Sequence, residues 1–383
     1  MNERQLTSWE ATALMVGAGV GAGIMAVPFL AQRVGLLGLA IILPLAWAAS
    51  ALIHLMLAEI LFRTGRNLQV VELMRLYVLR GRIGKWILWA VFSLLSIAFL
   101  ANLAAYVSGA GEIVAGLTGI DRRVAELFIY VVSAGVVFFG LAGVGLAERF
   151  GALLLVGLVG MLAVAAIGAP FTAPLGPAGP PSAWLALYGM VMYAYWTFYS
   201  VPQVVKGVGT DHRAAVRAIC AGLAINGVLT AIVSVVALGI SSKVTEVAII
   251  GIAARLGSSV GVAGSLLVVV ALVTSYWSVS LALADILCER TGIPVRLAWL
   301  LATLPSLLVL WIGSWQFLEW LRLAAGATAI VVGLITVPMY RAAQKMGAVR
   351  DPAWTLGRWG SPLAQAFVVL SLVLMAIGSL IAT

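Results

Sequence analysis

Residues 17–23 read Gly-Ala-Gly-Val-Gly-Ala-Gly, and Ile24 and Pro28 follow them within the first long apolar segment of the chain. Glycines at alternate positions and a nearby proline are unfavourable in a continuous helix, because an interior Gly costs about 1 kcal/mol and an interior Pro about 3 kcal/mol. Inside a membrane, backbone freed from helical hydrogen bonds is tolerated only where it is buried in protein or lines a cavity. The stretch therefore predicts a broken helix that forms part of a site. Close helix packing is the alternative, since small residues four positions apart also let helices touch.

The composition indicates a polytopic membrane protein. Of 383 residues, 63% are hydrophobic and 10% are charged, whereas a soluble domain carries about 25% charged residues. The first segment lacks a small-x-small cleavage site before a polar domain, so we expect a membrane span and not a secretory signal. The net charge is +9, and the charged residues cluster in the loops between apolar segments. We therefore expect no nucleic-acid partner. Cys220 and Cys288 lie in apolar segments, and their spacing matches neither a metal site nor a redox pair. We expect both to be buried and to serve only in packing.

Eleven apolar segments have about the 20 residues that a bilayer-spanning helix needs. They are residues 10–33, 36–62, 86–115, 124–142, 146–169, 183–206, 213–240, 258–288, 297–315, 318–340 and 362–382. Only a short turn near Gly143 separates the fourth segment from the fifth. Residues 69–80 are too charged to span and are expected to form an interfacial helix. Residues 243–255 are expected to form a similar short helix on the other side. We predict an all-α fold with one transmembrane domain over residues 1–383.

The distribution of Lys and Arg predicts the orientation in the cell membrane, because cytoplasmic loops are enriched in these residues. With a cytoplasmic N-terminus, all but a few of the 23 Lys and Arg residues lie on the inner face. The exceptions are Arg33, Arg122, Arg123, Lys243, Arg255 and Arg322. The odd number of spans then predicts an extracytoplasmic C-terminus.

The sixth segment repeats the peculiarity of the first. Residues 188–202 read Tyr-Gly-Met-Val-Met-Tyr-Ala-Tyr-Trp-Thr-Phe-Tyr-Ser-Val-Pro. These aromatic and hydroxyl side chains lie in mid-span, whereas an aromatic belt lies at span ends. Segments one and six run in opposite directions, and interrupted helices at matching positions of two opposed halves indicate an inverted-repeat transporter with its site at the midplane. We predict repeat one at about 10–169, repeat two at about 183–340 and an extra helix at about 362–382.

The run Gly17–Gly23 leading into Ile24-Met25-Ala26-Val27-Pro28-Phe29 resembles the first-helix signature of the amino acid/polyamine/organocation superfamily. The resemblance is strongest to its amino acid/auxin permease branch and to the bacterial hydroxy and aromatic amino acid permeases. The eleven segments, the basic loop after the second and the stretch Thr274–Asp285 fit the same group. The resemblance spans essentially the whole chain. It implies a LeuT-type fold of five plus five inverted-repeat helices with an eleventh helix.

The resemblance also implies a substrate site. Free N–H groups at the start of the outer half-helix, at Gly21, Ala22 and Gly23, would bind the carboxylate of an amino acid. The set formed by Tyr193, Ala194 and Trp196 would supply carbonyls for the ammonium group and walls for the side chain. Tyr106 in the third span would add a hydroxyl or serve only in packing. No acid or base lies at the centre of spans one or six, which favours a neutral hydrophobic or aromatic substrate.

A coupling-ion site is implied in the same way. In the family, hydroxyls of the eighth span, here Thr274, Ser275 and Ser278, join carbonyls of the first broken helix to hold sodium. The carbonyls in this chain would be those of Gly17 and Val20. The alternative is that each hydroxyl bonds a carbonyl of its own helix. Ala18 and Ile24 stand where an asparagine ligand would help, and the fifth span lacks the lysine that some proton-coupled relatives use. The coupling ion thus stays open between Na⁺ and H⁺, and we expect no other cofactor.

Ionisable side chains inside membrane segments are functional candidates by default. Glu59, Asp285 and Glu289 lie near cytoplasmic ends, where a gating role or pairing with loop arginines is expected. The other two candidates, His54 and Glu112, are potential members of a proton relay.

Together these patterns predict a monomeric secondary active transporter that takes up a neutral amino acid by alternating access. The alternative is a permease-like receptor that senses an amino acid without net transport. We do not expect an enzyme, because the sequence has no Gly-x-Ser-x-Gly elbow, phosphate loop or His/Glu metal spacing. The expected partners are the amino acid and the lipid bilayer.

Overall fold

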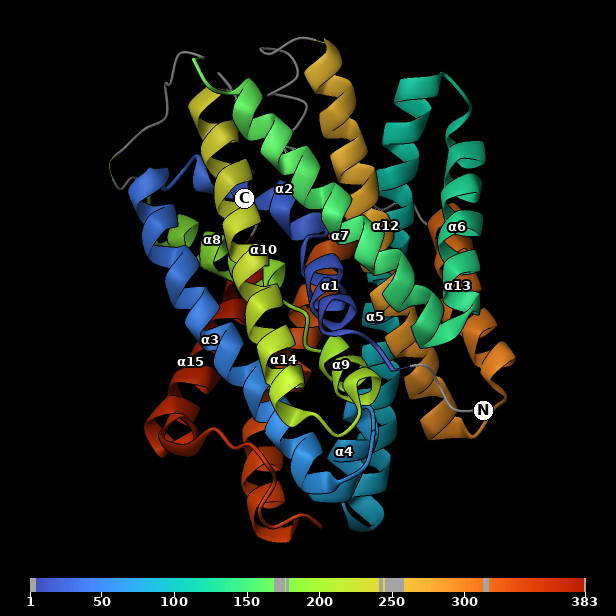
Figure 1. The fold of residues 1–383 in the computed structure, drawn as a ribbon, viewed down its shortest axis with the longest axis vertical. Coiled ribbons are helices and arrows are strands. Elements are labelled where there is room, and N and C mark those ends of the chain that lie inside the picture. The colour runs from blue at the N-terminus through green and yellow to red at the C-terminus, as the bar shows by residue number, and fades with distance from the viewer. Residues whose placement is uncertain are drawn as a thin grey trace.

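The computed structural model describes residues 5–168, 176, 179–240, 244, 258–312 and 317–381. Within these residues all regular secondary structure is helical, as predicted. The long helices run roughly parallel to the long axis of the molecule and surround the short helices α1 and α2 (Figure 1). The edges of the bundle are formed by α3 and α15 on one side and by α6 and α13 on the other.

Every predicted apolar segment contains a helix or a broken pair of helices. The helices are α1 (Ser8–Gly19), α2 (Ala22–Ala31), α3 (Gly35–Thr64), α4 (Val70–Tyr77), α5 (Gly81–Thr118), α6 (Arg122–Phe138), α7 (Gly140–Ala165), α8 (Pro181–Ala194), α9 (Ser200–Val208), α10 (His212–Ile240), α12 (Ser258–Thr291), α13 (Val295–Ile312), α14 (Phe317–Met346), η1 (Gly357–Gly360) and α15 (Pro362–Leu380). The short helix α4 occupies the predicted interfacial segment. The segment 243–255 lies outside the described residues apart from Val244. Cys220 and Cys288 are free and only partly buried, so the expectation of fully buried thiols was wrong.

Several helices could cross a membrane by length and hydropathy. Among the described residues, seven single helices meet this criterion, namely α3, α5, α7, α10, α12, α13 and α15. The pair α1 and α2, bent by 48°, provides an eighth. Helix α6 has only 17 residues, and α8 is separated from α9 by a break. The total of eleven spans therefore stays a prediction.

The turn between the fourth and fifth predicted segments lies earlier than expected. Helix α6 ends at Phe138, and Gly140 adopts a left-handed φ of +69°. Gly143 lies inside α7, so its predicted role in the turn was wrong. A left-handed residue is favourable mainly for glycine, which explains why the chain reverses at Gly140. The Arg296 guanidinium donates to the Phe138 carbonyl and stacks 3.6 Å from the centroid of that ring.

Both predicted helix breaks are present. Helix α1 ends at Gly19, Val20 has φ −77° and ψ 56°, and α2 begins after Gly21. The second break separates Ala194 at the end of α8 from Ser200 at the start of α9. The two broken pairs contact one another, α2 against α8 and α1 against α9.

The alternate glycines also explain how neighbouring helices approach the first break. A Cβ at each glycine would overlap an atom of a different helix. The overlapping atoms belong to Glu148 of α7 for Gly17, Asn226 of α10 for Gly19, Ser275 of α12 for Gly21, and Ala194 of α8 for Gly23. The two interpretations of the stretch are therefore both correct, because the same glycines break the helix and allow close packing.

A buried carboxylate ties the C-terminal part of the chain to α3. Glu59 accepts hydrogen bonds from Arg63 Nε at 2.8 Å, Tyr340 Oη at 3.0 Å and the Leu356 N–H at 2.8 Å. Glu59 is 1% exposed, so these bonds satisfy a charge that has little access to water. Arg63 lies in the last turn of α3, so Glu59 pairs with an arginine of its own helix and not with a loop arginine.

We expect Glu59→Leu to lower the free energy of unfolding by about 3–5 kcal/mol, because removing one partner leaves a buried ion pair uncompensated. Tyr340→Phe removes one hydrogen bond and should cost about 1 kcal/mol. Denaturant titration in detergent micelles measures both values. Equal stabilities of the two variants would contradict this account of the Glu59 contacts.

Candidate functional site

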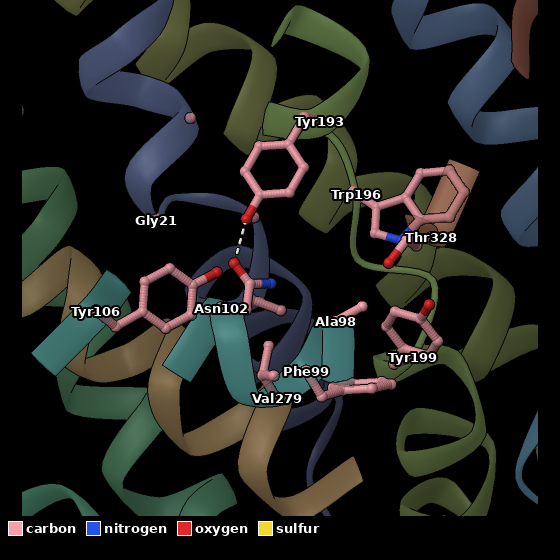
Figure 2. Close-up of a pocket in the computed structure, with 13 residues that line it drawn as sticks. Gly21, Ala98, Phe99, Asn102, Tyr106, Tyr193, Trp196, Tyr199, Val279 and Thr328 are labelled. Atoms are coloured by element: carbon pink, nitrogen blue, oxygen red, sulfur yellow. Dashed lines mark hydrogen bonds between the residues drawn. The ribbon is translucent and has the colours of Figure 1, made fainter. Parts of the chain in front are cut away.

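A narrow pocket lies between the two helix breaks (Figure 2). Its lining residues come from the first break, α5, the second break, α12 and α14. They are Ala18, Gly19, Gly21, Gly23, Ala98, Phe99, Asn102, Tyr106, Tyr193, Trp196, Tyr199, Val279 and Thr328. The free volume is about 20 Å³, which is room for little more than one water molecule.

One wall of the pocket is the start of α2. Gly21 is the N-cap residue of this helix and provides no side-chain acceptor. The first N–H groups of a helix have no intrahelical partner, and they lie at the positive end of the helix dipole. Gly21 and Gly23 line the pocket, and Ala22 is the first helical residue between them. The backbone here can bind an anionic group.

A polar cluster lies beside this helix start. The Tyr193 hydroxyl donates to Asn102 Oδ1. The Tyr106 hydroxyl points toward the same amide group (Figure 2), and it lies 3.7 Å from the position that a Cβ on Gly21 would occupy. The structure thus brings predicted residues from α2, α5 and α8 together around Asn102.

The rest of the wall is aromatic. The rings of Phe99 and Tyr199 lie 4.2 Å apart at their centroids. Trp196 lines the pocket and stacks on Phe198 at 5.6 Å. Ala194 instead packs against Gly23 behind the wall. An elongated apolar group could lie against these rings.

His54 holds the second break in place from behind the pocket. Its Nε2 lies 3.2 Å from the Thr197 N–H nitrogen and 3.0 Å from Thr197 Oγ1. Its Nδ1 lies 2.6 Å from the Ser50 carbonyl oxygen. Because a carbonyl only accepts, the proton is assigned to Nδ1, and Nε2 accepts from Thr197. Ser50 Oγ also donates to the Tyr195 carbonyl at 3.1 Å. Both ring nitrogens of the predicted relay residue are engaged in fixing backbone.

The predicted ion ligands lie at the end of α1. The Gly17 carbonyl accepts from Ser275 Oγ at 2.8 Å and from Thr274 Oγ1 at 3.4 Å. Thr274 also donates within its own helix, to Ala271 at 3.1 Å. The Val20 N–H bonds back to Val16 as the C-cap of α1. Gly17, Thr274 and Ser275 are thus neighbours.

Two residues of this region were missed by sequence reasoning. Ser278 donates to Glu148 Oε1 at 2.8 Å, and Glu148 on α7 is fully buried. Because Arg149 follows Glu148 directly, this part of the segment resembled a charged cytoplasmic end. Glu148 nevertheless follows eight apolar or small residues of α7, and this was a signal of an ionisable group inside the membrane. Asn102 was the other omission, and its position one helical turn before Tyr106 could have indicated it.

The remaining ionisable candidates lie away from the pocket. Glu112 is exposed at one end of α5 and lies 3.7 Å from Arg122. Asp285 and Glu289, near the end of α12, accept from the Gln69 side chain at 3.3 Å and the Gln69 N–H at 2.7 Å. They attach α12 to the start of α4.

The arrangement of the helices is that of a known transporter fold. The chain is similar in fold to Mhp1, a nucleobase-cation-symport-1 family transporter solved in a closed conformation with bromovinylhydantoin bound. The two are 15% identical with a TM-score of 0.68, and the match covers 99% of this chain and 91% of that one. The helices therefore adopt the LeuT-type transporter fold, as the superfamily resemblance implied.

The family is shown by a second comparison. The model of the tryptophan/tyrosine permease family matches residues 4–379. The chain belongs to this family. No curated protein matches it. The family and the fold together point to a multi-pass membrane transporter and not to an enzyme.

Gly23→Ala tests the close approach of the two breaks. Its Cβ would lie 2.6 Å from Ala194 Cα, so the backbone must shift and we expect a loss of about 1–3 kcal/mol in the free energy of unfolding. The matched control is Gly157→Ala on α7, where nothing lies within 4 Å. It should gain about 0.5–1 kcal/mol from helix propensity. Unfolding midpoints in detergent compare the two, and a common shift would argue against the close approach.

Proposed function

We propose that the protein takes up a neutral aromatic amino acid, tryptophan or tyrosine, by alternating access driven by a Na⁺ or H⁺ gradient. The observation that supports this most is the pocket in which a free helix start faces aromatic walls. The name of the tryptophan/tyrosine permease family supports the choice of substrate. Apolar walls suit an aromatic ring, while an α-carboxylate and an ammonium group need the ends of the broken helices.

The charged groups of the substrate would bind backbone. The N–H groups of Gly21, Ala22 and Gly23 would donate to the carboxylate at the positive end of α2. The ammonium group would donate to carbonyls at the end of α1, where Ala18 and Gly19 line the pocket. The Ala194 carbonyl at the end of α8 would be a further acceptor. The neighbouring carbonyls of Tyr193 and Tyr195 already accept from the Trp196 N–H and from Ser50 Oγ.

The side chain of the substrate would lie toward α5 and α14. Phe99, Trp196 and Tyr199 provide apolar area, and Asn102 and Thr328 provide polar groups for an indole N–H or a phenol hydroxyl. A site that hydrogen-bonds a polar atom discriminates against a ligand that lacks it, because the buried polar groups are then left unpaired. Phenylalanine should therefore bind less tightly.

The pocket must widen before such a ligand can enter. A free volume of about 20 Å³ is far below the 300–1,000 Å³ that is typical of ligand sites. We propose that helices around the breaks move apart toward one side of the membrane at a time. The Lys and Arg distribution supports a cytoplasmic N-terminus and an extracytoplasmic C-terminus in the cell membrane.

Uptake into proteoliposomes tests the proposal. Radiolabelled tryptophan or tyrosine should accumulate under an imposed Na⁺ or pH gradient, and the unlabelled amino acids should compete. Saturable binding without flux would indicate the receptor alternative. If none of the twenty amino acids accumulates under either gradient, transport is ruled out.

The Tyr193 hydroxyl can be tested by Tyr193→Phe. The change removes the hydroxyl that donates to Asn102 Oδ1 inside the pocket. We expect tryptophan affinity to fall roughly two- to tenfold, as for the loss of one hydrogen bond. The matched control is Tyr77→Phe, which loses a hydroxyl contact with Thr64 outside the pocket. Calorimetry in detergent measures both affinities. An equal effect of the two changes would exclude a specific role for Tyr193.

A further inference from the structure

A groove on the outside of the helix bundle lies between α14 and α15, and we refer to it as the α14–α15 groove. It has a volume of about 400 Å³ and is lined by Val337, Arg341, Pro362, Gln365, Ala366, Val369, Leu370 and Val373. The last four of these are exposed apolar side chains on α15, which is long and apolar enough to cross a membrane. Lipid tails are as apolar as these side chains, so this part of the groove suits hydrocarbon.

A guanidinium group is held at one end of the α14–α15 groove. Arg341 is exposed, and its Nε donates to Gln365 Oε1 at 2.6 Å. Gln365 is buried, and its Nε2 donates to the Gly360 carbonyl at 2.8 Å, so its amide is fixed and orients the arginine. Among the described interactions, no carboxylate pairs with Arg341, and its two terminal nitrogens have no partner. These nitrogens can donate two parallel hydrogen bonds to a phosphate group.

Large side chains beside the groove indicate its depth in the membrane. Trp359 and Leu363 are 60% and 82% exposed, and the Arg358 guanidinium lies 5.5 Å from the centroid of the Trp359 ring. An exposed tryptophan beside an arginine is typical of the boundary between lipid headgroups and hydrocarbon. From this boundary the groove follows α15 from Gln365 to Val373, a length of about 12 Å. The hydrocarbon core is about 30 Å thick, so the groove runs from headgroup level into one leaflet.

The groove begins at a positively charged end of the molecule. Residues 341–361 have a net charge of +3, and their charged side chains are Arg341, Lys345, Arg350, Asp351 and Arg358. Arg80, which follows α4, donates to Met346 Sδ at the end of α14. This end of α14 therefore lies beside the basic loop that is predicted to face the cytoplasm. Anionic lipids of the cytoplasmic leaflet attract basic segments of this kind.

A second groove beside α15 shows what the arginine adds. It has a volume of about 470 Å³ and is lined by Ile42, Gly179, Pro181, Trp184, Leu185, Tyr188 and Leu374. None of these described lining residues is charged. An apolar groove without charge offers no electrostatic contact that distinguishes one lipid headgroup from another. Arg341 gives the α14–α15 groove a charged contact that the second groove lacks.

We infer that the α14–α15 groove binds one anionic phospholipid of the cytoplasmic leaflet. The lipid phosphate accepts hydrogen bonds from the terminal nitrogens of Arg341, and one acyl chain lies along Ala366, Leu370 and Val373. Hydrogen bonds between two charged groups are among the strongest in proteins. A second copy of this protein in the same membrane orientation suits the groove less well, because it would bring its own basic segment to the same level. The inference is independent of the substrate that the protein transports.

Native mass spectrometry of the full-length protein in detergent tests the choice of headgroup. Phosphatidylglycerol and phosphatidylcholine with the same acyl chains are added separately, and the wild type should bind the anionic lipid roughly tenfold more tightly. Arg341→Gln should remove this preference, because the phosphate loses its charged donor. The matched control is Arg213→Gln at the start of α10, an exposed arginine on the same predicted face but outside the groove. It should keep the preference.

Ala366→Trp tests the acyl chain separately, and it keeps the inference testable if Arg341→Gln does not fold. Ala366 is exposed on α15, so the larger side chain fills the groove without entering the core. Binding of phosphatidylglycerol should fall roughly tenfold, as for the loss of contacts equivalent to about two methylene groups. The matched control is Ile377→Trp, which places the same side chain at an exposed position of α15 that lines neither groove. It should leave lipid binding unchanged.

Four results would overturn the inference. Equal affinity of the wild type for the two lipids would remove the role of the headgroup charge. An equal loss in Arg341→Gln and Arg213→Gln would reduce the effect to a general attraction between a basic surface and anionic lipid. Unchanged binding in Ala366→Trp would place the lipid elsewhere. A dimer that forms without lipid and is lost in Ala366→Trp would make the groove a contact between two copies of the chain.

Discussion

The backbone that is left unpaired at the end of α1 is the constraint on which the surrounding structure depends. In a low-dielectric bundle each unsatisfied carbonyl is costly, so donors must come from other helices. Ser275 and Thr274 donate to Gly17, and Asn226 Nδ2 donates to Met15 at 3.0 Å. Asn226 and Ser275 reach this backbone because Gly19 and Gly21 have no Cβ in the way.

Side chains hydrogen-bond the backbone differently at the two helix breaks. At the second break, His54 and Ser50 of α3 bond the backbone of Thr197 and Tyr195 directly. At the first break, the start of α2 has no side-chain cap, and Gly21 faces the pocket. Side chains of α3 therefore fix the backbone of the second break, whereas the first N–H groups of α2 at the first break have no side-chain cap. The proposed carboxylate site depends on this difference between the two breaks.

The sequence was sufficient for features that depend on local backbone chemistry. Glycine spacing and mid-span aromatics predicted both breaks, and the hydroxyls at 274 and 275 were correctly placed beside Gly17. Features that depend on which helix faces which could not be derived in this way. Glu148 resembled the charged end of a span, and only packing shows its carboxylate against Gly17. Glu112 resembled a membrane carboxylate, yet its side chain is exposed, because one helix sequence does not reveal which face the bundle covers.

The close contacts of the glycines divide the site into two kinds of position. Positions at the breaks meet four different helices, so their side-chain volume is fixed by the architecture. Phe99 and Asn102 on α5 and Thr328 on α14 contribute side chains from continuous helices. Substitutions on α5 and α14 can therefore reshape the cavity without disturbing the helix breaks. Substrate preference is expected to diversify at these positions.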